Sequence, residues 1–180
     1  MLSDAWLVEP LGRIRVCLPK TTHLATIDGT WPARRKDSDR HKDAWEWTRL
    51  VRDLAECFIA VEEDDRPIGI WGSRRETLLR LPGGSYYRLD FLEADPDRRG
   101  GPVGVLTIGL AACRALELAA DGMVLATFPI EGLRRFYKAV GAVEERARGW
   151  NCDKHLLPFH FNAAALKRLR EATDELLEIT

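Results

Sequence analysis

The feature that most constrains the fold is a strand, a glycine-rich turn and a helix that follow one another in the middle of the chain. The side chains of residues 86–94 alternate in type with a period of two. This pattern predicts a strand in which Asp90 points to the face opposite Phe91. Residues 95–104 are rich in glycine and arginine, and an apolar stripe predicts a helix from about 105 to 120. Because helices and strands alternate without regular βαβ units, we expect an α/β (mixed α+β) fold with a mixed sheet.

The N-terminal part of the chain predicts a short strand at 13–18. A loop is expected at 19–42, where turn-forming residues are present and hydrophobic periodicity is absent. Apolar residues at helical spacing predict a helix over 42–56. Two apolar runs, 57–61 and 68–71, are separated by a polar turn. These two runs predict an antiparallel hairpin.

The C-terminal part predicts a short buried strand at 123–127 and an amphipathic helix at 133–140. Further strands are expected at 143–149 and 155–161. A final helix is expected over 162–180, whose first residue, an asparagine, is a favoured N-cap.

Length and composition indicate one globular domain spanning residues 1–180. The chain is 46% hydrophobic and 31% charged, which is typical of a folded protein. Its net charge of -1 means that the chain lacks the excess of positive charge typical of nucleic-acid-binding domains, so no nucleic-acid partner is expected. The N-terminus lacks the pattern of a signal peptide, and no stretch approaches the roughly 20 apolar residues of a membrane span. We therefore expect a cytoplasmic protein with no membrane partner.

The cysteines are widely spaced, which favours reduced thiols over a disulfide framework. They are Cys17, Cys57, Cys113 and Cys152. Cys152, His155 and His160 could form a metal site, but they lack a fourth ligand and match no common zinc spacing. No metal is predicted.

The turn at 96–104 has the properties of a phosphate site. Glycines let the backbone approach a ligand closely, and the N–H groups and dipole at the start of a helix favour an anion. Arg98 and Arg99 add positive charge. Many such turns only connect elements, so the residues on both sides must decide between the two interpretations.

This segment resembles motif A of GNAT-type N-acetyltransferases, in which an Arg/Gln-x-x-Gly-x-Gly/Ala turn holds the pyrophosphate of CoA. In the register 99–104, Pro102 replaces the first motif glycine. In the register 98–103, Val103 replaces the second. The resemblance implies a GNAT-like fold with a mostly antiparallel sheet that splays between two central strands.

A second segment resembles motif B, in which a helix that carries Phe-Tyr ends in a glycine. Here the pair is Phe136-Tyr137 and the glycine is Gly141. The resemblance implies that Tyr137 protonates the departing CoA thiolate as general acid. The alternative is a core tyrosine on an apolar helical stripe. Ile130 stands where many relatives carry an asparagine that contacts the pantetheine arm.

The strand before motif A supplies backbone contacts to pantetheine in the family, and one N–H polarises the thioester. By position these contacts fall to Leu92, Glu93 and Ala94. A base must also deprotonate the acceptor ammonium. Asp90 is the first candidate and Glu93 the second, although either carboxylate also fits a surface or ion-pair role.

The resemblance implies acetyl-CoA as acyl-donor co-substrate and a primary amine of a small molecule, peptide or protein as acceptor, in a monomer or a homodimer. The implied cofactor-binding residues are Leu92, Glu93, Ala94, Arg98, Arg99, Gly100, Gly101, Pro102, Val103, Gly104 and Tyr137. Two alternatives stay open. One is a degenerate GNAT-like module without catalysis, and the other is an ordinary phosphate- or nucleotide-binding α/β domain.

Overall fold

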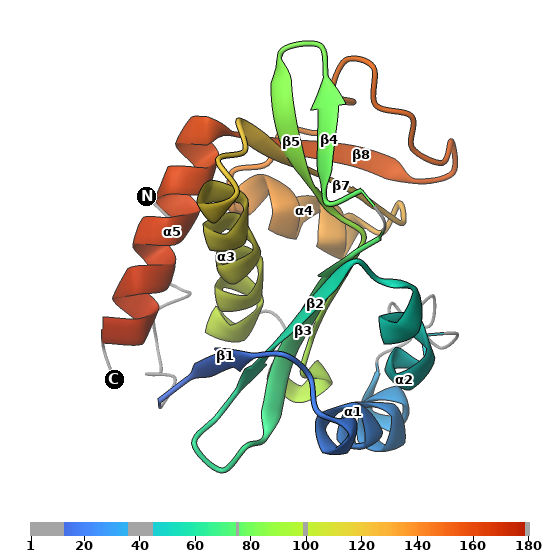
Figure 1. Cartoon of the computed structure of the whole chain (residues 1–180), viewed down its shortest axis with the longest axis vertical. Helices are drawn as coiled ribbons and strands as arrows, with labels where there is room; N and C mark the ends of the chain where they lie inside the picture. The colour runs from blue at the N-terminus through green and yellow to red at the C-terminus, as the bar shows by residue number, and fades with distance from the viewer. Residues whose placement is uncertain (1–12, 36–44, 75, 99–100, 179–180) are drawn as a thin grey trace.

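The computed structural model describes residues 13–35, 45–74, 76–98 and 101–178. Five α-helices are found in these ranges (Figure 1): α1 (Thr21–Arg34), α2 (Trp47–Leu50), α3 (Pro102–Glu117), α4 (Glu131–Ala139) and α5 (Ala163–Glu178). The strands are β1 (Arg15–Cys17), β2 (Glu56–Val61), β3 (Pro67–Ser73), β4 (Leu78–Leu81), β5 (Gly84–Leu89), β6 (Phe91–Ala94), β7 (Gly122–Thr127) and β8 (Leu157–Asn162). Short 3-10 helices cover Val51–Asp53 and Pro96–Arg98.

The strands form two four-stranded sheets, ordered β1-β2-β3-β6 and β4-β5-β7-β8. Pairing between the described strands is antiparallel except for β5 and β7, which run parallel. The mixed, mostly antiparallel α+β fold is thus confirmed. The β5–β7 pairing ends at Leu89↔Leu125, after which β6 joins β3 in the other sheet. Strands β6 and β7 therefore splay apart, because the chain passes from one sheet to the other between β5 and β6.

The passage between sheets occurs at Asp90, which interrupts the single strand expected at 86–94. The Asp90 amide donates to the Gly72 carbonyl at 3.1 Å, while Gly72 is also the register partner of Phe91. Two residues opposite one partner form a β-bulge, which shifts the alternation of side chains. Leu89 accordingly packs in the core beside α3, whereas Phe91 packs beneath α1. The expectation of a regular alternation through Phe91 was wrong.

Sheet β1-β2-β3-β6 is covered by helices on both faces, which explains why every residue of β3 is buried. One core joins Ile68 and Trp71 to α3 and α5. The other joins Ile59 and Ile70 to α1 and α2. Figure 1 shows α3 and α5 side by side, away from α1 and α2. Strand β6, which follows Asp90, is therefore held between two packed layers.

The loop expected at 19–42 was wrong over its first part, where α1 forms. Leu24, Ile27 and Trp31 are spaced i, i+3 and i+7 and are buried against the sheet. Tertiary burial of this stripe outweighs the turn-forming residues around it, including Pro32 in the last turn. Residues 36–42 lie outside the described ranges.

Three other local predictions need correction. The helix expected at 42–56 is found only as α2 and a 3-10 turn, and its first residues are not described. The strand expected at 143–149 is replaced by turns and one isolated bridge, Val143↔His160. Strand β4 was missed. It pairs with β5 across Gly83 and Gly84, both of which have positive φ.

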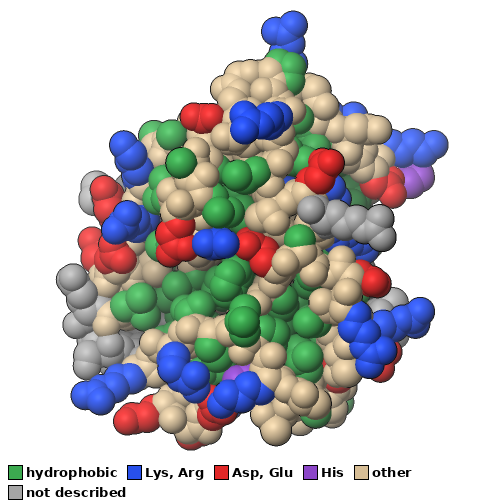
Figure 2. Space-filling view, in the orientation of Figure 1, with side chains coloured by type: hydrophobic (Ala, Val, Ile, Leu, Met, Phe, Trp, Pro, Cys, Tyr) green, Lys and Arg blue, Asp and Glu red, His purple; other side chains and the backbone are tan. Residues whose placement is uncertain are grey.

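The remaining elements are confirmed. The hairpin of β2 and β3, strands β7 and β8, and helices α3, α4 and α5 form where expected within a few residues. The Asn162 side chain accepts the Ala165 amide at 2.9 Å and caps α5. Gly141 ends α4 with φ +94. None of the described helices has the length and apolar character of a membrane span. Figure 2 shows Lys and Arg scattered mostly around the rim of the visible face, without one continuous basic patch.

Candidate functional site

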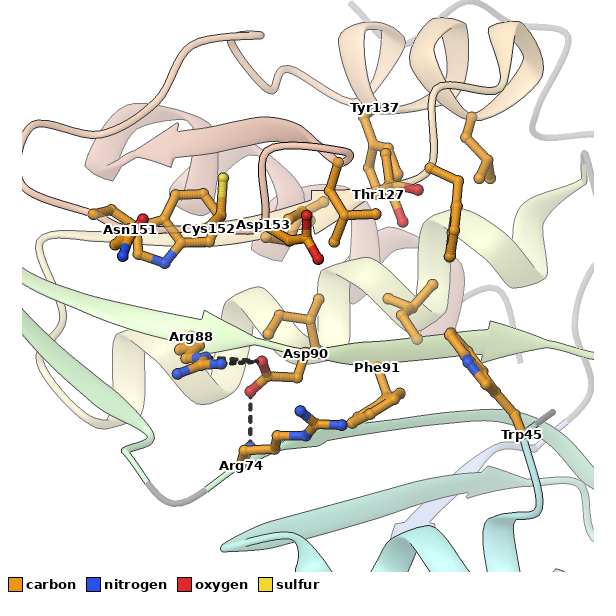
Figure 3. Close-up of a pocket in the computed structure, with 18 residues that line it drawn as sticks. Trp45, Arg74, Arg88, Asp90, Phe91, Thr127, Tyr137, Asn151, Cys152 and Asp153 are labelled. Atoms are coloured by element: carbon orange, nitrogen blue, oxygen red, sulfur yellow. Dashed lines mark hydrogen bonds and ion pairs between the residues drawn. The ribbon is translucent and has the colours of Figure 1, made fainter. Parts of the chain in front are cut away.

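A cavity of about 350 Å³ lies where β5 and β6 diverge from β7 (Figure 3). Its walls come mainly from these three strands, α4 and the loop before β8. The lining residues are Trp45, Arg74, Arg88, Leu89, Asp90, Phe91, Leu92, Leu125, Ala126, Thr127, Phe128, Leu133, Tyr137, Trp150, Asn151, Cys152, Asp153 and Leu156. The volume is within the range of small-ligand sites, and the lining combines apolar and aromatic side chains with charged and polar ones.

Tyr137 reaches the cavity from the buried side of α4, as the helical spacing of its sequence predicts. Its ring packs against Phe136 and Phe159, with centroid separations of 5.3 Å in both cases. Burial raises the pKa of the Tyr137 hydroxyl, so the group carries its proton at neutral pH. Tyr137 thus lines the cavity as a protonated phenol, and its inward orientation is confirmed.

Asp90 also lines the cavity, at the bulge between the two sheets. Its Oδ1 accepts the Arg88 Nε–H at 2.8 Å and lies 2.7 Å from Arg88 Nη2. Its Oδ2 accepts the Arg74 backbone N–H at 2.8 Å. A carboxylate has about four acceptor sites, so these contacts orient Asp90 without using its full capacity. Figure 3 shows the ion pair along one wall.

Glu93 does not reach the cavity. Its side chain is fully buried on the opposite face of β6, where Trp47 Nε1 donates to Oε2 at 2.8 Å. Arg35 Nε donates to Oε1 at 3.0 Å and Arg35 Nη2 to Oε2 at 3.2 Å. The bulge turns this carboxylate toward α1. Glu93 therefore holds buried partners together and does not face the cavity, as a base for the acceptor would.

The backbone segment expected to meet pantetheine is β6, the end strand of its sheet. Leu92 lines the cavity, and the buried Ala94 continues the strand away from it. Asp95, fully buried, fixes the end of β6. Its two oxygens lie 3.1 Å from Arg34 Nη1 and 3.1 Å from Arg66 Nη2. The edge beside the splay is therefore rigidly attached to α1 and to the β2–β3 turn.

The predicted phosphate turn leads from β6 into α3, and Arg99 and Gly100 lie outside the described residues. Gly101 is the N-cap of α3 and Pro102 its first residue. Proline is favoured at this position because the N–H it lacks has no partner within a helix.

Two further residues of the turn have packing roles. Val103 and Gly104 are buried, and a Cβ on Gly104 would lie 3.5 Å from the Phe136 ring. This is an ordinary van der Waals distance, so the contact between α3 and α4 does not by itself require glycine at position 104. Arg98 forms an ion pair with Glu62, so its charge is already balanced.

Several residues of the cavity were not predicted as site residues. Arg74 follows β3, Trp45 precedes α2, and Trp150 and Asp153 lie in the loop before β8. Asp153 accepts the amide of His155 at 2.9 Å. None of these segments has a periodic pattern or a motif, so no signal in the sequence placed them together. The one hint in the sequence is that tryptophans are numerous in its N-terminal half, which is compatible with an aromatic pocket as well as with a buried core.

The structure also locates the cysteines and histidines. All four cysteines are free thiols, and burial raises the pKa of Cys57 to about 12. Within the described ranges, no group of three or more His, Cys, Asp or Glu side chains is arranged to hold a metal ion.

Comparison with known proteins rests on structure alone. No protein-family model matches the sequence, and no curated protein sequence is significantly similar to it. The GNAT family N-acetyltransferase YhbS from Escherichia coli, solved with CoA, is 16% identical with a TM-score of 0.55, over 88% of this chain and 87% of that one.

Two more solved structures are similar. The PaiA N-acetyltransferase from Thermoplasma acidophilum, in complex with coenzyme A, has a TM-score of 0.55 at 15% identity, over 83% of this chain and 98% of that one. The NatC complex bound to Gag peptide and CoA has a TM-score of 0.56 at 13% identity, over 82% and 96%. The chain therefore has the fold of the GNAT N-acetyltransferases.

Proposed function

We propose that this protein transfers an acetyl or other short acyl group from acyl-CoA to a primary amine by direct attack. The observation that supports this proposal is that Tyr137 and Asp90 line one cavity at the point where β6 leaves β7. A proton donor and a proton acceptor on the same cavity are what amide formation from an ammonium and a thioester needs.

In the proposed reaction, Asp90 removes one proton from the acceptor ammonium. The amine nitrogen attacks the thioester carbon and a C–N bond forms. The tetrahedral intermediate then collapses, the C–S bond breaks, and the thiolate takes the hydroxyl proton of Tyr137. The phenolate recovers a proton from the nitrogen as the amide forms. The products are an N-acyl amine and CoA, and the proton on Asp90 returns to solvent.

The raised pKa of Tyr137 would by itself make proton transfer to a thiolate less favourable. A thiolate that leaves in the same buried site has its own pKa raised by the same loss of solvation. The gap in pKa between the two groups therefore stays near its value in water, although each pKa is raised. Burial also keeps the tyrosine protonated until the C–S bond breaks.

The donor would place its pyrophosphate at the start of α3. The amides of Gly101, Val103 and Gly104 lie in the first turn of a helix of 16 residues, where an anion is favoured. Pro102 removes one donor from this set. The backbone of Leu92, Glu93 and Ala94 would receive pantetheine and polarise the thioester, with donors worth about 3 kcal/mol in such sites.

A charge substitution at Gly101 tests the donor site. Gly101 has extended backbone angles, and a Cβ there would lie 3.4 Å from the Arg98 carbonyl, so a small side chain fits. Asp and Ser are both favoured N-caps, so neither Gly101→Asp nor Gly101→Ser should lower the Tm of the free protein. Only Gly101→Asp adds a negative charge where the pyrophosphate is expected.

Acetyl-CoA at a hundredfold excess over Kd should raise the Tm of the wild type and of Gly101→Ser by about 5–10 °C. Gly101→Asp should lose most of this rise. The proposal is wrong if acetyl-CoA, CoA and longer acyl-CoAs leave the wild-type Tm unchanged. Protection by ATP or NAD instead would support a nucleotide-binding domain.

A second candidate is a degenerate module that binds CoA or a protein without catalysis. Pro102 in the first turn of α3 and the pairing of Arg98 with Glu62 favour it. Turnover separates the two functions. An active enzyme should release CoA with an amine panel, and Tyr137→Phe should lower kcat by about 100-fold. Binding of acetyl-CoA without turnover over the whole panel would support the module.

A further inference from the structure

The charged groups of the cavity are not all paired with one another, and this bears on the acceptor. Arg88 and Asp90 neutralise each other across 2.7–2.8 Å. Arg74 has no carboxylate partner within the described part of the chain, and Asp153 has no cationic one there. The cavity therefore offers one cation and one anion to a ligand.

The Arg74 side chain is held in a defined place. Its Cζ lies 5.0 Å from the centroid of the Phe91 ring, in a cation–π contact. Its backbone N–H is fixed by Asp90 at 2.8 Å. A contact with a ring uses none of the hydrogen-bonding capacity of the N–H groups, and the planar edge of a guanidinium matches a carboxylate through two parallel hydrogen bonds.

The two charges lie on different walls of the cavity. Figure 3 shows Arg74 and Phe91 on the wall of β3 and β6, while Asp153 approaches from the loop on the side of Tyr137. Trp45, Phe91 and Trp150 add aromatic surface to the lining of the cavity. A molecule that matches this arrangement carries an ammonium, a carboxylate and an apolar part, in a volume of about 350 Å³.

Resting on the proposed function, we infer that the acceptor is an amino acid: a small primary amine that also carries a carboxylate, which Arg74 binds. Arg74 is a specificity-determining residue in this account. It contacts the acceptor carboxylate and not the reacting atoms. Asp153 attracts the ammonium to the side of the cavity on which Tyr137 lies.

The test compares the free amino acids with the amines that lack only the carboxylate, for example phenylalanine with 2-phenylethylamine and tryptophan with tryptamine. CoA release is measured with acetyl-CoA at saturation. At least one amino acid should show a kcat/KM about tenfold or more above that of its decarboxylated partner. Arg74→Gln should reduce this preference about tenfold, mainly through the KM of the amino acid, and Arg74→Lys should restore part of it.

Arg80 provides the matched control, because it is an exposed arginine on β4 outside the cavity lining. Arg80→Gln should leave the preference unchanged. The inference is overturned if the decarboxylated amine is the better acceptor in every pair, if only peptides are accepted, or if Arg74→Gln and Arg80→Gln have equal effects. These results leave the N-acyltransferase proposal standing. Loss of acetyl-CoA binding in the wild type would remove both.

Discussion

The two faces of β6 and its bulge use carboxylates in opposite ways. On the α1 face, Glu93 and Asp95 are fully buried and are held by Arg35 and by Arg34 with Arg66. On the cavity face, Asp90 keeps 14% of its side chain exposed and faces open volume. Three acidic residues within six positions thus have two kinds of environment. Depth of burial, set by one bulge, separates the two carboxylates enclosed in ion pairs from the one that is accessible from the cavity.

The largest expected effect lies on the buried face. Glu93→Gln removes a charge that is paired with Arg35, whose side chain is 1% exposed. Breaking one partner of a buried ion pair costs about 3–5 kcal/mol because the other charge stays buried. Urea denaturation should therefore show a free energy of unfolding lower by this amount.

The matched control for Glu93 is Glu131→Gln. Glu131 is exposed on α4 and lies 3.7 Å from Arg135, so its loss should change stability by less than about 0.5 kcal/mol. If Glu93→Gln is as mild as Glu131→Gln, the buried face does not hold β6 in the way described above.

An intermediate effect on stability and a large effect on rate are expected on the cavity face. Asp90→Asn keeps an oxygen for the Arg74 amide but gives up the charge paired with Arg88. The free energy of unfolding should fall by about 1 kcal/mol, because the pair is partly exposed. If Asp90 is the base, kcat should fall by about 100-fold.

Asp153→Asn serves as the comparison for Asp90, since both carboxylates line the cavity. It should act mainly on the KM of the amine, with a smaller change in kcat. A larger loss of kcat in Asp153→Asn than in Asp90→Asn would transfer the role of base to Asp153. Steady-state kinetics on both variants, with circular dichroism to verify folding, decides between them.

The sequence predicted the parts of this comparison that depend on local patterns. The strand before the turn, α3 and the inward Tyr137 follow from periodicity and from a motif, and Asp90 and Leu92 do line the cavity. It did not predict the bulge. A period of two assumes regular pairing, and only the shared partner Gly72 reveals the extra residue.

The acceptor side of the cavity was beyond prediction for a different reason. Arg74, Trp45 and the loop at 150–153 come from segments that are far apart in the chain and have no repeat or motif. Their proximity depends on how the two sheets diverge, which is a tertiary property. Glu93 was a plausible base by sequence because its face could not be known before the bulge was located.

The smallest effect is expected at the surface, where Asp65 completes the series from buried to exposed. It lies in the β2–β3 turn with φ +66 and accepts hydrogen bonds from Lys20 at 2.9 Å and from Arg15. His23 Nε2 lies 3.0 Å away. Contacts with Lys20 and then His23 lower the pKa of Asp65 from 3.8 to about 2. Asn tolerates positive φ, so Asp65→Asn changes the charge with little backbone strain.

Because the pKa of Asp65 in the folded state lies below its unfolded value, its contribution to stability is present above about pH 4 and is lost as pH falls through 2. The Tm of Asp65→Asn should lie below that of the wild type at pH 7, by less than for Asp90→Asn. That gap should persist down to about pH 4 and then close toward pH 2. A gap that stays constant to pH 2 would mean that Asp65 stabilises the turn through its backbone conformation and not through its charge, and the series from Glu93 to Asp65 would then not be graded by electrostatics.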